Sequence, residues 1–113
     1  MSPITTHVLD TASGSPASGV AVFLEYQKDA TTWLPVTEKE TNRDGRVADL
    51  ISEESFNPGT YRITFETASY FKKKNLETFY PYASIVFEVK NSKEHYHVPL
   101  LISGHGYSTY RGS

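Results

Sequence analysis

Three polar side chains of this sequence are suited to proton transfer on an anionic small molecule: His7, Arg46 and His97. An imidazole exchanges a proton near neutral pH without a large pKa shift. A guanidinium stays charged and can hold an anion. Two imidazoles and one fixed cation therefore make a candidate site for general acid and base catalysis.

The alternation of apolar residues places both histidines off the core. In residues 95–102, Tyr96, Val98 and Leu100 form one apolar face, and His97 points the other way. In residues 4–10, Ile4, Thr6 and Val8 share one face, and Thr5, His7 and Leu9 share the other. We therefore expect His7, Arg46 and His97 to meet on one exposed sheet face.

A turn over residues 42–45 is expected to position Arg46. This stretch ends in an Asp-Gly pair between two extended segments, which favours the positive φ of a hairpin turn. Arg46 then becomes the first residue of the next strand.

Each of these residues also has a simpler interpretation. A single exposed histidine or a lone arginine at a turn is more often an inert surface group than a functional one. For His95 the inert interpretation is favoured, although its spacing of two from His97 puts both rings on one face and allows a zinc pair. The sequence offers no third ligand, so we predict neither a metal nor another cofactor.

The elements that must position these residues are short strands. Alternating stretches between turn residues predict strands at 4–10, 20–27, 33–41, 60–66, 84–90, 95–102 and 107–111, with a further strand starting at Arg46. Residues 67–75 lose the alternation and predict one short helix, with Thr67 as its N-cap and Asn75 at its end. Seven or eight strands with one brief helix indicate an all-β fold, an antiparallel β-sandwich that forms a single domain over residues 1–113.

Composition limits the partners. The chain has 113 residues and a formal net charge of −2, with its charges dispersed, which argues against nucleic acid or an anionic membrane as partner. It has no cysteine, no apolar run of membrane-spanning length and no secretory pattern at its start. We expect a cytoplasmic protein, although a peroxisomal location stays open. A chain of this length has little room for a deep cleft of its own, which favours a site between subunits.

Three motifs carry a resemblance to a known family. They are HVLD at 7–10, HYHVPLL at 95–101 and GYSTYRGS at 106–113. Together with NRDGRV at 42–47 and FYPYASIVFEV at 79–89, they resemble the transthyretin-related family of 5-hydroxyisourate hydrolases nearly from end to end. In that family a YRGS ending is typical of the purine-catabolic enzyme, and true transthyretins lack it.

The resemblance implies a transthyretin-like sandwich, a homotetramer with a central channel, and a hydrolase of 5-hydroxyisourate that needs no cofactor. It implies that His7 and His97 activate water and return a proton, while Arg46 holds the substrate's oxygens. It further implies that Tyr110 shapes the pocket and that Ser113 orients substrate or water through its hydroxyl and terminal carboxylate. Arg111 belongs to the same motif. It either binds substrate or pairs with carboxylates to fix the C-terminal tail, residues 110–113.

Two departures from the family pattern and two rival functions stay open. Gly104 and His105 stand where relatives have a proline and an aromatic residue, and Tyr82 stands where an acidic residue is common. The first rival is a transthyretin-type carrier of an aromatic ligand, although such a channel needs apolar walls rather than imidazoles. The second is a structural sandwich that binds a protein partner through one sheet.

Overall fold

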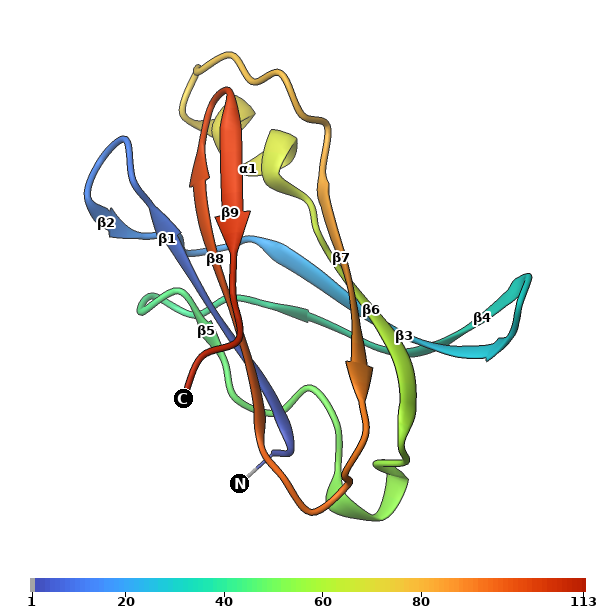
Figure 1. Ribbon diagram of the computed structural model, residues 1–113. Helices are drawn as coiled ribbons and strands as arrows, with labels where there is room; N and C mark the ends of the chain where they lie inside the picture. The colour runs from blue at the N-terminus through green and yellow to red at the C-terminus, as the bar shows by residue number, and fades with distance from the viewer. Residues whose placement is uncertain (1) are drawn as a thin grey trace.

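Two β-sheets face each other in the computed structural model, which describes residues 2–113 (Figure 1). The first sheet has the order β2-β1-β8-β9, with β5 also paired to β1. Its strands are β1 (Ile4–Asp10), β2 (Ser15–Pro16), β5 (Arg46–Val47), β8 (Tyr96–Ser103) and β9 (Gly106–Thr109). The second sheet has the order β4-β3-β6-β7 and consists of β3 (Ala21–Asp29), β4 (Thr32–Glu40), β6 (Gly59–Phe65) and β7 (Ala83–Val89).

The core lies between the sheets and follows the predicted alternation. In β1, Ile4, Thr6 and Val8 are buried, and the residues between them are half-buried on the outer face. In β6, Tyr61, Ile63 and Phe65 are buried in the same way. The predicted all-β sandwich with one short helix is therefore confirmed.

One strand pair departs from the antiparallel pattern. β1 and β8 run parallel, in a register that pairs Ile4 with Tyr96 and Asp10 with Ile102. The two strands lie near opposite ends of the chain, and no turn of the sequence joins them directly, so local patterns carry no signal of their direction. This register sets which outer-face side chains of β1 lie beside those of β8.

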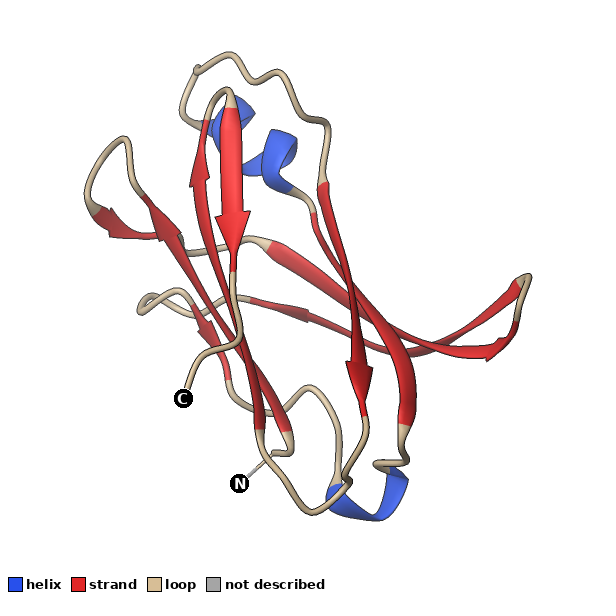
Figure 2. Cartoon of the chain, in the orientation of Figure 1, coloured by secondary structure: helices blue, strands red, loops and turns tan. Residues whose placement is uncertain are grey.

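The predicted helix forms, but its N-cap is not the predicted residue. α1 (Thr67–Lys73) starts after Glu66, and Thr67 is a buried residue of the first turn. The prediction of Thr67 as N-cap was therefore wrong, because burial against the core overrides its capping preference. The helix does end near Asn75, which takes a left-handed φ of 59°. A second short element, the 3₁₀ helix η1 (Glu53–Ser55), lies at the opposite end of the molecule from α1 (Figure 2).

A buried carboxylate ties α1 to the end of β1. Asp10 accepts hydrogen bonds from the Tyr70 hydroxyl at 2.8 Å and from the backbone amides of Ala12 and Ser13 at 3.0 and 3.2 Å. Burial acts to raise the pKa of Asp10, but these hydrogen bonds outweigh it and hold the pKa below its ordinary value. The carboxylate therefore stays ionised and anchors the helix to the strand that carries His7.

The turn between β8 and β9 contains Gly104 for a steric reason. A Cβ at this position would lie 2.7 Å from the carbonyl oxygen of Glu77. The Gly104 carbonyl also accepts a hydrogen bond from the Phe79 amide at 2.7 Å. The glycine therefore lets the segment after α1 approach this turn closely.

The structure also bears on membrane insertion. No helix within residues 2–113 has the length and apolar character needed to cross a membrane.

Candidate active site

The turn over residues 42–45 makes Arg46 the first residue of β5, as the sequence predicts, but it is not the predicted hairpin turn, because β4 lies in the second sheet and β5 pairs with β1. The Asn42 side-chain oxygen accepts hydrogen bonds from the amides of Asp44 and Arg46 at 2.9 and 3.0 Å. Gly45 has a φ of 74°, and a Cβ there would overlap the carbonyl oxygen of Val8. The turn therefore packs directly on β1 and pairs Arg46 with His7 in the β-ladder.

Strand register brings the second histidine to the same face. β8 pairs with β1 so that His97 lies beside Thr5, and Pro99 lies beside His7. Directly paired residues project from the same side of a sheet. His7, Arg46 and His97 consequently share the outer face of the first sheet, on the three neighbouring strands β1, β5 and β8 (Figure 1).

A hollow of about 290 Å³ opens on this face. It is lined by Thr5, Thr6, Arg46, Val47, Ala48, His95, His97 and Ser113. Three of the predicted site residues, Arg46, His97 and Ser113, thus contribute to one concavity. His7 is not among the lining residues, but it pairs in the β-ladder with Arg46, which is one of them.

The residues after β9 lie across His97. The Gly112 amide donates a hydrogen bond to the His97 carbonyl at 2.8 Å, which forms an isolated antiparallel bridge. A Cβ on Gly112 would lie 2.6 Å from Cδ2 of the His97 ring and 3.2 Å from Cγ of Pro99. Glycine therefore lets the tail lie flat against the imidazole and brings Ser113 to the hollow.

The Gly112→Ala variant should lose activity without losing its fold. The added methyl group displaces the His97 ring, and a misplacement of about 1 Å can cost on the order of 10²-fold in rate. We expect kcat/KM to fall by about 10- to 100-fold while the melting temperature stays within a few degrees of the wild-type value. Gly106→Ala is the matched control, since its Cβ would meet only the Ser103 hydroxyl at an ordinary 3.8 Å. Equal kcat/KM values for the two variants would contradict a positioning role for Gly112.

Arg111 and Tyr110 lie away from this hollow. Arg111 donates to a carboxylate oxygen of Glu94 at 3.0 Å and stacks over the Tyr96 ring with 4.3 Å between its Cζ and the ring centroid. Of the two roles considered for Arg111, these contacts match that of fixing the tail. Tyr110 is largely exposed and, with Arg111, lines a separate hollow of about 160 Å³ that His97 also lines.

Both catalytic candidates among the histidines are held neutral. Burial lowers the pKa of His7 and of His97 below the ordinary 6.5, and the positive charge of Arg46 lowers both further. The neighbouring rings of His95 and His7 add to the lowering at His97. At neutral pH each imidazole therefore has a free lone pair that can accept a proton.

Sequence reasoning missed Thr5 and underrated His95. The Thr5 hydroxyl lies 2.8 Å from Nδ1 of His97 and 3.0 Å from Nε2 of His95, and all three residues line the hollow. The alternation does place Thr5 on the same face as His7, but only the parallel register shows that it touches His97. Within residues 2–113, no three histidine, aspartate or glutamate side chains are grouped as metal ligands.

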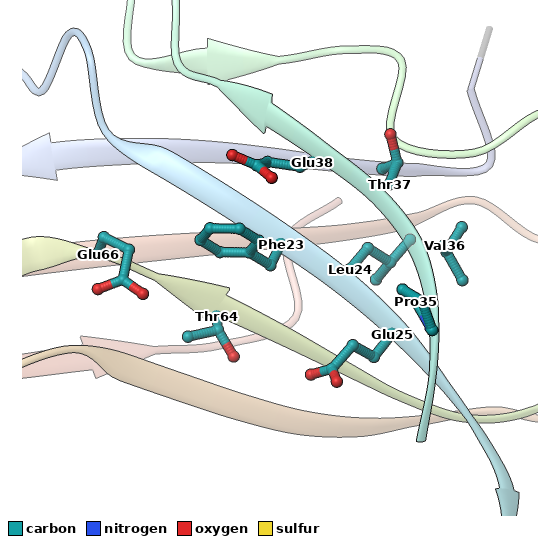
Figure 3. Close-up of a pocket in the computed structure, with 9 residues that line it drawn as sticks. All are labelled: Phe23, Leu24, Glu25, Pro35, Val36, Thr37, Glu38, Thr64 and Glu66. Atoms are coloured by element: carbon teal, nitrogen blue, oxygen red, sulfur yellow. The ribbon is translucent and has the colours of Figure 1, made fainter. Parts of the chain in front are cut away.

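A larger hollow of about 430 Å³ lies on the outer face of the second sheet (Figure 3). It surrounds the half-buried Phe23 and carries three carboxylates, those of Glu25, Glu38 and Glu66. Only Glu25 of the three has an arginine partner, Arg62 at 2.8 Å. This hollow has the wrong charge for an anionic substrate and contains none of the predicted residues, so the smaller hollow, which contains Arg46 and His97, is the candidate active site.

Several known proteins resemble this chain in sequence and in fold. The model of the HIUase/Transthyretin family matches residues 4–112. A 5-hydroxyisourate hydrolase of Deinococcus radiodurans is 48% identical over 97% of this chain and 95% of its own length. The solved 5-hydroxyisourate hydrolase of Klebsiella pneumoniae superposes with a TM-score of 0.84, at 35% identity over 97% of this chain and 98% of that one. Sea bream transthyretin in complex with thyroxine reaches a TM-score of 0.93, at 29% identity over 97% and 94% of the two chains.

Proposed function

Since this chain belongs to the HIUase/Transthyretin family, we infer that it is an enzyme of that family and hydrolyses 5-hydroxyisourate to 2-oxo-4-hydroxy-4-carboxy-5-ureidoimidazoline. This reaction belongs to urate catabolism. The inference rests on one observation. On the outer face of the first sheet, two neutral imidazoles and a guanidinium lie together at the hollow. The hydrolase is also the name that curated relatives bear at nearly full length.

We propose the following roles for the site residues. His97 takes a proton from a water molecule as that water adds to a ring carbonyl carbon. The ring C–N bond then breaks, and an imidazolium of the His7 and His97 pair returns a proton to the leaving nitrogen. Arg46 holds the substrate's oxygens and stabilises the negative charge that develops on the attacked carbonyl.

Residues of the tail complete the proposed pocket. Ser113 lines the hollow beside His97, from where its hydroxyl can orient substrate or water. Tyr110 lines the separate hollow of about 160 Å³, so within one chain it lies outside the proposed pocket. Arg111 supports the tail through its contacts with Glu94 and Tyr96, and we assign it no direct contact with the substrate.

The rival function is that of a carrier of an aromatic ligand, and the sea bream relative was solved in complex with thyroxine. A site for an apolar aromatic ligand is lined predominantly by apolar and aromatic side chains. The hollow described above contains Arg46, two histidines and two threonines instead. This lining favours hydrolysis of a polar, anionic ring.

An ultraviolet assay during urate oxidation separates the two functions. We expect the absorbance of 5-hydroxyisourate to disappear faster when the protein is added, because general acid and base catalysis is worth about 10²- to 10⁴-fold in rate. The control is the same reaction with heat-denatured protein. Decay at the spontaneous rate with folded protein would contradict the hydrolase and favour the carrier.

We propose that the enzyme is a homotetramer. A single chain exposes large apolar side chains that association would cover, among them Phe79 (71% exposed), Val86 (57%) and Tyr110 (60%). The polar outer face of the first sheet, with its shallow hollow, also suits a site completed by a second subunit. Sedimentation equilibrium tests this assembly, and a folded, fully active monomer would contradict it.

A further inference from the structure

The Thr5 hydroxyl lies between two imidazoles. Its Oγ1 is 2.8 Å from Nδ1 of His97 and 3.0 Å from Nε2 of His95, and the ring centroids are 6.4 Å apart. Both distances are those of good hydrogen bonds. The parallel register of β1 and β8 puts Thr5 directly beside His97, so the strand pairing itself creates this arrangement.

The number of hydrogens at this junction restricts the tautomers of the two rings. A threonine hydroxyl donates one hydrogen and accepts through its lone pairs, and a neutral imidazole donates at one nitrogen and accepts at the other. If the Thr5 hydroxyl donates to His95, it can only accept from His97. His97 then carries its hydrogen on Nδ1 and has a bare Nε2.

The Thr5 backbone favours this arrangement, because it is a second hydrogen-bond acceptor for the His97 ring beside the hydroxyl. Arg46 and His7 act against positive charge at His97, so its ring is neutral and carries a single hydrogen. Glu94, which precedes His95, is occupied by Arg111 at 3.0 Å. Nδ1 of His97 is engaged by the Thr5 hydroxyl at 2.8 Å, so Nε2 is the ring nitrogen left for a ligand in the hollow that His97 lines.

We propose that Thr5 is a positioning residue for the hydrolysis, which holds His97 in the tautomer with a bare Nε2, and that His95 orients the Thr5 hydroxyl for this purpose. The inference rests on the proposed role of His97 as the base. Only a bare Nε2 can take the proton of the attacking water. With the hydrogen on Nε2 instead, His97 would donate to the water and could not activate it.

Nitrogen-15 chemical shifts of the His97 ring test this proposal without reference to activity. In the wild-type protein near pH 7.5 we expect a protonated Nδ1 and a bare Nε2. Thr5→Val keeps the size of the side chain but removes the hydroxyl, and it should move the hydrogen toward Nε2. Thr5→Ser keeps the hydroxyl and should preserve the wild-type shifts.

The kinetic effect should follow the tautomer. One neutral hydrogen bond of this kind biases an equilibrium by about 3- to 10-fold, so kcat/KM of Thr5→Val should fall by about that factor. We expect kcat/KM to fall by the same factor at every pH of the plateau, without a shift of the acid limb. The reason is that the two tautomers of His97 carry the same number of protons. Thr5→Ser should stay within about 2-fold of the wild type. The matched control is Thr64→Val, which removes a threonine hydroxyl bonded to Ser84 at 3.2 Å on the second sheet.

Several outcomes would overturn the proposal. A wild-type His97 with its hydrogen on Nε2 would do so, as would unchanged His97 shifts in Thr5→Val. His95→Ala provides a second variant, in which the freed hydroxyl should turn partly toward His97 and raise the Nε2-protonated fraction. An unchanged tautomer there would refute the role of His95. Failure of the wild-type protein to hydrolyse 5-hydroxyisourate would refute the proposed function instead, and the chemical shifts would still decide how Thr5 holds His97.

Discussion

His97→Asn should lower kcat/KM for 5-hydroxyisourate by about 10²-fold or more, because it removes the group that accepts the proton of the attacking water. Asparagine has no group that exchanges a proton near neutral pH. It is smaller than histidine but still polar, so it can bond the Thr5 hydroxyl. His97 is half-buried on the outer face of the sheet and contributes little to the core, so the melting temperature should change by only a few degrees.

His105→Asn is the matched control for this variant. His105 is exposed in the turn between β8 and β9 and has no contact with the hollow. The comparison needs initial rates at several substrate concentrations, corrected for spontaneous decay, together with thermal unfolding curves. A His97→Asn enzyme within 2-fold of the His105→Asn enzyme would eliminate His97 as the base.

Arg46→Gln should produce the second large loss. Removing a donor that stabilises developing negative charge typically costs about 10²- to 10³-fold in kcat. Arg46 is exposed at the end of its turn, and glutamine preserves the length of the side chain, so the fold should persist. Arg43→Gln, in the same turn and also exposed, controls for the loss of one positive charge.

The same variant should shift the pH dependence. In the wild type, His7 and His97 have pKa values below 6.5, partly because of the charge of Arg46. Their neutral forms are the active ones in the proposed mechanism, so kcat/KM should be constant near pH 7 and fall only as the pH drops below 6.5. Without Arg46 the two pKa values rise, more of each imidazole is protonated at a given pH, and the acid limb moves to higher pH.

A kcat/KM profile from pH 5 to 8 for the Arg46→Gln and Arg43→Gln enzymes measures both effects. An acid limb that stays at the wild-type position would contradict the electrostatic coupling of Arg46 to the histidines. An undiminished plateau would contradict its role as substrate anchor. The two results are independent, because the limb reports protonation of the free enzyme and the plateau reports stabilisation of the transition state.

The linked stability effect has the same direction. A histidine whose pKa is lowered in the folded state binds more protons when unfolded, so acidification through the region below 6.5 favours unfolding. His7 and His97 therefore cost stability in acid and none near neutral pH. Both activity and stability are expected to be higher at neutral than at mildly acidic pH.

The sequence by itself determined which residues of each strand share a face. Side chains alternate across a strand with a period of two, so Ile4, Thr6 and Val8 could be assigned to the core and His7 to the outer face without knowing any neighbour. The Asp-Gly pair likewise determined that Arg46 opens the next strand, because a glycine is needed where φ is positive. The YRGS ending and the histidine motif were enough to indicate the family.

Only the tertiary structure decided which outer-face side chains touch. Thr5 and His97 are separated by 92 positions, and their hydrogen bond exists because β1 and β8 pair in parallel in one register. A shift of one residue would turn the apolar face of β1 to solvent, so packing of the core selects the register, and the core is formed by both sheets together. The same long-range packing placed Arg111 on Glu94 and Gly112 on the His97 ring. Local sequence therefore identified His7, Arg46 and His97, and the pairing of distant strands determined the geometry of the site and added Thr5 to it.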